Sequence, residues 1–227
     1  MAGGLHDLLS RFGGRRGEPS GTPAASKTAD APELVYPTKA LPKFLTNVAV
    51  KPAPVLLDLG PVVGSNVSFF GEELGCRLRV EDLFGDIERH AVAGTLDQLP
   101  AFFRNRFKSE PGSVDGILCW DVFDFLDRAS ATALAATLAR LLVADGSLLG
   151  FFNTSAEPGR AVYTKYVVVD RGTLRYRGFG GHQTRQRSLQ NRDIIKLFET
   201  LRVSDSFLMK TNMREIIFRK PAYLAGL

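Results

Sequence analysis

Acidic residues and glycines that suit a ribose-containing ligand follow two apolar segments in the first half of the sequence. They are Asp58, Gly60, Gly64, Glu81 and Asp82. A turn such as Gly60-Pro-Val-Val-Gly64 lets a ligand approach the backbone closely, because glycines carry no side chain. An acid about 20 residues farther along, here Asp82 or its neighbour Glu81, can accept hydrogen bonds from both ribose hydroxyls. The alternative is that Asp82 is an ordinary surface acid at the end of a strand.

Two further groups of polar residues lie near the ends of apolar segments. Thr95-Leu-Asp97 precedes an expected helix, and Trp120 and Asp121 occur near the end of the segment Val114–Phe123. If that segment is a strand of an open parallel sheet, its carboxyl end lies where such sheets bind ligands. Trp120 is equally compatible with a place in the core.

No residue is predicted to be a catalytic base. His182 and Tyr163 qualify only by residue type, and a lone histidine is more often a surface or structurally bonded residue. Cys76 and Cys119 lie far apart, in no spacing typical of a metal site or of a disulfide framework. The sequence therefore predicts no metal, and its cysteines fit a reducing compartment.

The elements that must position these residues alternate between strands and helices. Apolar runs predict strands at 55–59, 78–83, 90–95, 114–123 and 147–152, and apolar residues at helical spacing predict helices at 65–75, 99–107, 130–143 and 190–201. A β-hairpin is expected at 162–179, with further strands at 203–210 and 215–219. Ser65 or Asn66 is the expected N-cap of the first helix, and Gly75 its end. The alternation indicates an α/β fold, a doubly wound and mostly parallel sheet with helices on both faces.

The order of these motifs over Pro54–Lys220 resembles that of class I S-adenosylmethionine-dependent methyltransferases, which have a Rossmann-like sheet with a C-terminal antiparallel hairpin. Val55–Gly64 resembles the family's first motif, Val114–Leu126 its fourth strand and following loop, and Arg140–Leu149 the next helix, turn and strand. The resemblance implies S-adenosylmethionine as cofactor. It assigns cofactor binding to Asp58, Gly60, Gly64, Glu81, Asp82, Thr95, Leu96, Asp97, Trp120 and Asp121.

The sequence departs from the family's pattern at two places. Val62 replaces the middle glycine of the turn, and its branched side chain could point into the cofactor's space. The adenine-contacting loop has Thr95 where an acid is usual, and Asp97 comes two residues late. The Asn-Pro-Pro-aromatic and Pro-Cys motifs of enzymes that methylate nucleic-acid bases are missing. Two functions stay open: a methyltransferase acting on another kind of acceptor, and a catalytically inactive methyltransferase-like scaffold or interaction protein.

Composition divides the chain into a tail and one domain. Residues 1–35 are rich in Gly, Pro, Ala and Ser and are predicted to be disordered, with Leu5–Phe12 as a short amphipathic segment for a protein partner. Residues 36–227 suffice for one methyltransferase-like domain. No apolar run approaches the length of about 20 residues that spans a membrane. The N-terminus also lacks the layout of a cleavable signal, so a cytoplasmic protein is expected.

Basic residues are concentrated in the last third of the chain. Residues 51–150 carry 9 basic and 14 acidic side chains, whereas residues 151–227 carry 14 basic and 6 acidic ones. The stretch Lys165–Arg192, which includes a hairpin inserted at about 161–180, has seven basic residues and one acid. It predicts an anionic partner, which adds an RNA- or membrane-surface-binding module as a third functional class. A solvated basic surface is the simpler interpretation.

Overall fold

The computed structural model describes residues 34–155, 162–185 and 189–222. Almost all of the predicted tail, including Leu5–Phe12, lies outside the described residues. Leu34 and Val35 are the exception, because they belong to strand β1 (Leu34–Pro37), which pairs antiparallel with β7 (Thr173–Gly180). The prediction that the tail extends to residue 35 is therefore wrong for these two apolar residues, which extend an ordered strand.

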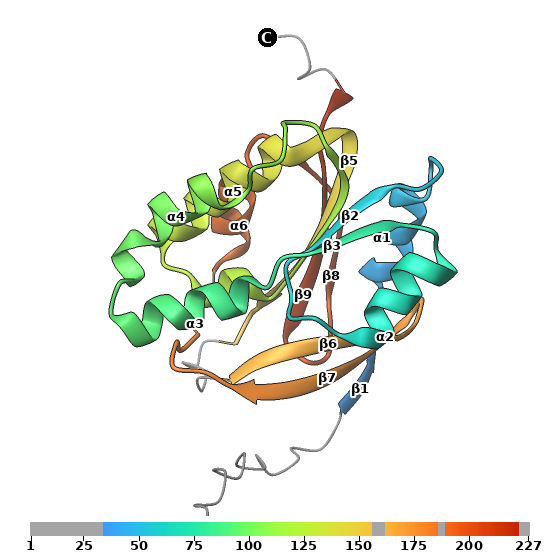
Figure 1. Cartoon of the computed structure of the whole chain (residues 1–227). Helices are drawn as coiled ribbons and strands as arrows, with labels where there is room; N and C mark the ends of the chain where they lie inside the picture. Colours follow the sequence, from blue (N-terminus) through green and yellow to red (C-terminus); the bar gives the residue numbers. More distant parts are fainter. Residues whose placement is uncertain (1–33, 156–161, 186–188, 223–227) are drawn as a thin grey trace, which may run out of the picture. The chain divides into compact units, whose positions relative to one another are not determined.

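Six strands form the main sheet, in the order β3-β2-β4-β5-β9-β8 (Figure 1). Their bounds are β2 Val55–Asp58, β3 Arg77–Val80, β4 Val114–Trp120, β5 Leu142–Asn153, β8 Arg202–Leu208 and β9 Met213–Arg219. The strands β3, β2, β4 and β5 are parallel to one another, whereas β9 is antiparallel to both β5 and β8. The α/β fold with its antiparallel C-terminal pair is thus confirmed.

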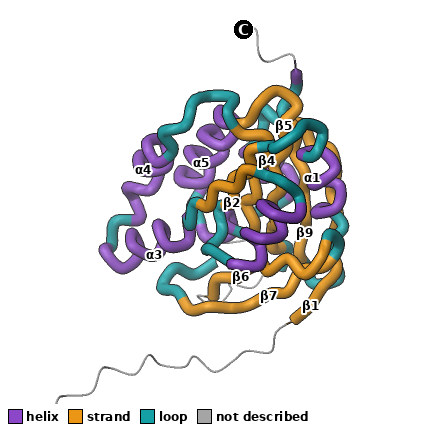
Figure 2. The backbone as a smooth tube through the Cα atoms, turned by 45° about the vertical axis from the view of Figure 1, so that its right-hand side comes forward, coloured by secondary structure: helices purple, strands orange, loops and turns teal. Residues whose placement is uncertain are grey.

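Helices cover both faces of this sheet (Figures 1 and 2). On one face lie α1 (Ala40–Val48) and α2 (Gly64–Val67), which continues as a wider π-helical turn over Ser68–Glu73. On the other face lie α3 (Leu83–Ala93), α4 (Leu99–Arg106), α5 (Arg128–Leu141) and α6 (Asn191–Leu197).

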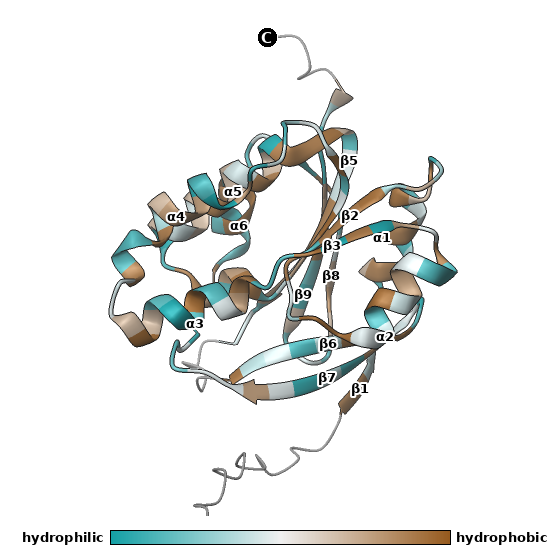
Figure 3. Cartoon of the chain, viewed as in Figure 1, coloured by the Kyte–Doolittle hydropathy of each residue, from teal (hydrophilic) through white to brown (hydrophobic). Residues whose placement is uncertain are grey.

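Strand residues alternate between these two faces and so build two apolar cores. In β2, Leu56 packs on the α1 side and Leu57 on the side of α3 to α5; in β4, Leu118 and Ile117 divide in the same way. Both faces of the sheet are therefore buried. This explains why β2 and β4 read as almost continuous apolar runs, which the brown colouring of β2 in Figure 3 illustrates.

The strand predicted at 90–95 does not form, because its residues complete and follow α3. Asp82 caps the start of this helix, its Oδ1 accepting the Gly85 N–H at 3.0 Å, and Gly94 ends it with a φ of +67°. Between these two signals lie 11 residues, enough for three helical turns. Within the described residues, β3 is consequently an edge strand of the main sheet.

The start of α2 also differs from the prediction. Val63, in an extended conformation, occupies the N-cap position that Ser65 or Asn66 was expected to take. Asn66 instead binds the backbone of β6 (Val162–Asp170). Its Nδ2 donates to the Tyr166 carbonyl at 2.8 Å, and its Oδ1 accepts the Val168 N–H at 2.8 Å. A contact with a strand 100 residues away therefore replaces the local cap.

The predicted hairpin forms as β6 and β7 but stays outside the main sheet. With β1 it makes a separate sheet in the order β1-β7-β6. Contacts of Tyr166 with Asn66 and Trp120 place β6 across the edge at which β2 and β4 end. The hairpin therefore lies over the predicted ligand site.

Candidate functional site

At the carboxyl ends of β2 and β4, residues that the sequence assigned to a ligand are bonded to one another. Asp58 ends β2 and is only 3% exposed. Its Oδ1 accepts the Gly60 N–H at 2.9 Å and the Trp120 Nε1–H at 2.6 Å. Because β2 and β4 are parallel neighbours, their last residues meet at one edge of the sheet. The structure brings these three residues together, while their role in cofactor binding stays a prediction.

Burial alters the acid strength of Asp58. Loss of water around the carboxyl raises the pKa of Asp58 to about 6, although the hydrogen bonds from Gly60 and Trp120 act in the opposite direction. These two N–H donors therefore stabilise the ionised form of the Asp58 carboxyl.

The indole of Trp120 fills the space beside the glycine turn. A Cβ atom built on Gly60 would lie 2.9 Å from Cδ1 of Trp120 and 3.0 Å from its Nε1. Trp120 has a φ of +48°, a left-handed conformation that is costly for a bulky side chain. The bond to Asp58 and nearly complete burial offset this cost. The absence of a side chain at Gly60 thus accommodates the protein's own indole.

Aromatic side chains close the site around the indole. Tyr166 of β6 stacks on Trp120 with the ring centroids 5.1 Å apart and the planes 5° from parallel. Phe151 of β5 meets the indole edge-on at 5.6 Å. Tyr166 is 3% exposed, so the hairpin that carries it seals this end of the sheet.

Asp121, the residue after Trp120, binds a different partner. It is fully buried, and its Oδ2 lies 2.6 Å from Nη2 of Arg185. Burial raises the pKa of Asp121, and the charge of Arg185 limits that rise. Asp124 lies nearby; burial first and the charge of Asp121 second raise its pKa to about 7. Arg185 is therefore held by buried acids and is not part of a solvated basic surface.

Glu81 and Asp82 lie beside Asp58 but already have structural partners. The N–H of Glu81 donates to the Asp58 carbonyl at 2.8 Å, which fixes the end of β3 against β2. The Glu81 carboxylate lies 2.7 Å from Nη2 of Arg106, and the Asp82 carboxylate caps α3. Their assignment to ribose stays a prediction.

Thr95, Leu96 and Asp97 do not join this group. They follow the end of α3, about 16 Å along that helix from Asp82 at 1.5 Å per residue. Thr95 Oγ1 lies 2.9 Å from Nδ1 of His90, Leu96 packs against the core, and Asp97 is exposed. The assignment of these three residues to adenine required a strand at 90–95, and the helix removes that basis.

Sequence analysis missed a cluster on the side of α3. Glu88 accepts hydrogen bonds from Tyr163 Oη at 3.0 Å and from the His182 N–H at 2.8 Å, and it also contacts Nδ1 of His182. Burial alone would raise the pKa of Glu88, but the bonds from His182 and Tyr163 bring it below its ordinary value. The cluster fastens the end of β7 to α3. No local pattern signals it, because Tyr163 and His182 are 75 and 94 residues from Glu88.

Val62 is 67% exposed and so makes little contact with the rest of the described protein. The side chain that packs against the glycine turn is Trp120, whose residue type was equally compatible with a place in the core or at a ligand.

The position of the Trp120 indole bears on where S-adenosylmethionine could bind. The resemblance places the methionine part of the cofactor against the glycine turn, and the Trp120 indole occupies the space beside Gly60. Within the described residues, no cluster of three or more His, Cys, Asp or Glu side chains could hold a metal ion, and no helix is both long and apolar enough to cross a membrane.

No sequence-family profile matches the chain, and no curated protein matches it in sequence. Solved structures do resemble it. A S-adenosylmethionine-dependent methyltransferase from Clostridium acetobutylicum shares 12% identity over 80% of this chain and 91% of its own, with a TM-score of 0.50. The 1,6-didemethyltoxoflavin-N1-methyltransferase of Burkholderia thailandensis, solved with S-adenosylhomocysteine, shares 15% identity over 81% and 77%, with a TM-score of 0.49. At such identities the likeness shows the fold alone: this chain has the class I methyltransferase fold.

Proposed function

We propose that this protein is an interaction protein with a methyltransferase fold that does not transfer methyl groups. The observation that supports the proposal is the Trp120 indole packed directly against Gly60, in the turn at which the resemblance places the cofactor. The hydrogen bond to Asp58 and the contacts with Tyr166 and Phe151 hold the indole there. Four separate elements thus contribute to closing the site.

Opening the site has an energetic cost that a cofactor would have to supply. Exposing a buried aromatic side chain costs about 3 kcal/mol, and leaving the buried Asp58 carboxylate without one of its donors costs a further 1–3 kcal/mol or so. A total of about 4–6 kcal/mol lowers the apparent affinity of any ligand by roughly a thousand-fold or more. We therefore expect no cofactor binding at micromolar concentrations.

The alternative is an S-adenosylmethionine-dependent methyltransferase whose acceptor is not a nucleic-acid base. The outer part of the turn favours it, because Val62 is largely exposed and a Cβ built on Gly64 would have nothing within 4 Å. Gly64 is therefore not explained by packing. For this function, Trp120 and Tyr166 must leave their positions when the cofactor enters.

The chain contains a single tryptophan, so fluorescence can decide between the two functions. Trp120 is 2% exposed, and its emission should be blue-shifted and resistant to acrylamide quenching. Addition of S-adenosylmethionine or S-adenosylhomocysteine up to millimolar concentration should change neither property, and calorimetry should record no heat of binding. ATP serves as a control for ionic effects. The protein unfolded in urea gives the reference fluorescence of an exposed indole. Micromolar binding with a red shift would contradict the proposal and support the methyltransferase.

A further inference from the structure

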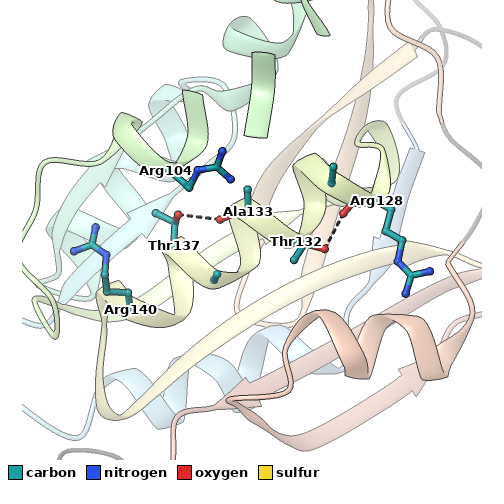
Figure 4. A pocket seen from close by; sticks show the side chains of 8 residues that line it. Arg104, Arg128, Thr132, Ala133, Thr137 and Arg140 are labelled. Carbon is teal, nitrogen blue, oxygen red and sulfur yellow. Dashed lines mark hydrogen bonds between the residues drawn. The ribbon is translucent and has the colours of Figure 1, made fainter. Parts of the chain in front are cut away.

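A shallow groove between α4 and α5 has a basic rim and a floor of small side chains. Its volume is about 840 Å³, and Figure 4 shows the side chains that line it. Alanine and threonine side chains of α5 form the floor, while Arg104 of α4 and Arg128 and Arg140 of α5 border it. Solvated helix faces usually carry long charged or polar side chains, and this face of α5 lacks them between its two arginines.

The floor of the groove is largely apolar although two threonines contribute to it. The Oγ1 hydroxyl of Thr132 donates to the Arg128 carbonyl at 2.8 Å, and that of Thr137 to the Ala133 carbonyl at 2.9 Å (Figure 4). Both hydroxyl protons are thus used within α5 itself. Small side chains such as Ala133 and Ala136 allow a second helix to approach closely, since the distance between packed helices depends on the side chains at the contact.

The rim of the groove is positively charged. Arg104, Arg128 and Arg140 are exposed, and none of the described residues that line the groove is acidic. Within the described part of the chain, neither Arg104 nor Arg128 has a carboxylate partner. Arg128 and Arg140 lie at opposite ends of α5, about 18 Å apart at 1.5 Å per residue. The positive charge therefore extends along about three helical turns.

From this combination we infer that the groove binds an acidic amphipathic helix of a partner protein. Three turns of such a helix match the length of the rim; its apolar side chains contact the alanine floor and its carboxylates face the arginines. A nucleic acid suits the surface less well, because its phosphates would leave the apolar floor without contacts. The inference does not depend on the proposed function, since Trp120 packs in the core on the opposite face of the sheet.

A synthetic peptide provides the test. The probe is an acetylated, fluorescein-labelled peptide of four helical turns, with a stripe of Leu and Ala flanked on both sides by Glu. A second peptide carries Gln at every Glu position. Fluorescence anisotropy with the full chain at low ionic strength should show micromolar binding of the Glu peptide and at least ten-fold weaker binding of the Gln peptide. Added salt should weaken the Glu complex.

Variants of the chain locate the binding surface. The double substitution Arg104→Gln and Arg128→Gln should weaken binding about three- to thirty-fold, as expected for the loss of two partly exposed ion pairs. The matched control, Arg202→Gln with Lys210→Gln, removes the same charge from exposed positions elsewhere and should leave binding unchanged. Ala136→Glu, which places a carboxylate on the floor, should abolish binding without changing the melting temperature.

Three outcomes would overturn the inference. The first is absence of Glu-peptide binding at millimolar concentration. The second is an equal loss in the Arg202 and Lys210 control, which would indicate attraction to net charge alone. The third is preferential binding of a single-stranded oligonucleotide through Arg104 and Arg128, which would assign the groove to a nucleic acid.

Discussion

The end of the sheet at Trp120 and the groove on α5 differ in how their polar side chains are used. At the sheet end, Asp58 and Asp121 have the types and positions expected of a ligand site, but each is buried and bonded within the protein. In the groove, Arg104 and Arg128 belong to none of the motifs found in the sequence. They are exposed and have no carboxylate partner in the described part of the chain. The sheet end was therefore predicted as a binding site from the types of its residues. The groove is instead inferred to be a binding site from exposed arginines that have no carboxylate partner in the described part of the chain.

Topology and free space are separate properties of the sheet end. The parallel strands still bring Asp58 and Trp120 together, because register and strand order determine that meeting. Whether the meeting leaves space for a ligand depends on the side chains packed there, which are Trp120, Tyr166 and Phe151. An inherited fold therefore does not establish a function, which must be argued from the site itself.

The largest expected effect comes from Trp120→Ala. Removing a fully packed aromatic side chain should lower the free energy of unfolding by about 3–5 kcal/mol, measured by urea denaturation followed by circular dichroism. If the variant folds, it should also show whether the indole alone closes the site, because S-adenosylhomocysteine would then bind where the wild type does not. A loss below about 1 kcal/mol would mean that the indole is not packed as described.

A smaller effect is expected from Asp124→Asn, through pH. The pKa of Asp124 is about 7 in the folded protein against 3.8 as its ordinary value, because of burial and the charge of Asp121. The folded state therefore binds the proton more tightly, and stability is lost as pH rises from about 4 to 7. Asparagine cannot ionise and can still accept the Asn153 N–H. The stability of the variant relative to wild type should rise by about 2–4 kcal/mol between pH 4 and 8.

Urea titrations of both proteins across that pH range give the measurement. Asp58 and Asp121 also have raised pKa values from burial, so the variant should reduce the pH dependence without removing it. A stability difference that stays constant with pH would show that Asp124 is not the ionising group.

The two outer glycines of the turn should respond differently to the same substitution. Gly60→Ala places a Cβ 2.9 Å from the indole and should cost about 1–3 kcal/mol, whereas Gly64→Ala meets nothing within 4 Å and should be nearly neutral. In the Trp120→Ala background, the cost of Gly60→Ala should largely disappear, which a double-mutant cycle would measure as coupling. Equal costs at both glycines would contradict the account of the closed site.

Most of the fold could be predicted because its signals are local. Apolar periodicity identified β2, β4, α4 and the hairpin, and the order of the elements indicated a mostly parallel sheet. The strand predicted at 90–95 was wrong because the prediction used only a short apolar run. It left out two helix signals, the N-cap Asp82 and the C-terminal Gly94. The Asn66 cap was wrong because its side chain binds a strand 100 residues away.

The site could be predicted only in part. Parallel topology correctly placed Gly60 and Trp120 at one edge of the sheet, but no pattern revealed that the indole bonds to Asp58. That bond depends on the left-handed backbone of Trp120 and on Tyr166, which a hairpin 46 residues later supplies. Such dependence on distant residues is why side-chain closure could not be read from the sequence.

The smallest expected effect is that of Val62→Gly, and it separates the two accounts of the turn. If Val62 blocked the site, glycine would restore cofactor binding to a silent protein. Because the proposed closure lies with Trp120, we expect no gain in affinity for S-adenosylhomocysteine, measured by calorimetry. The glycine should lower the free energy of unfolding by about 0.5 kcal/mol through added backbone freedom. The matched comparison is Trp120→Ala, which removes the side chain packed against Gly60. If the glycine variant alone gained binding, Val62 in the turn would be the residue that blocks the cofactor. The proposed closure by Trp120 would then be wrong.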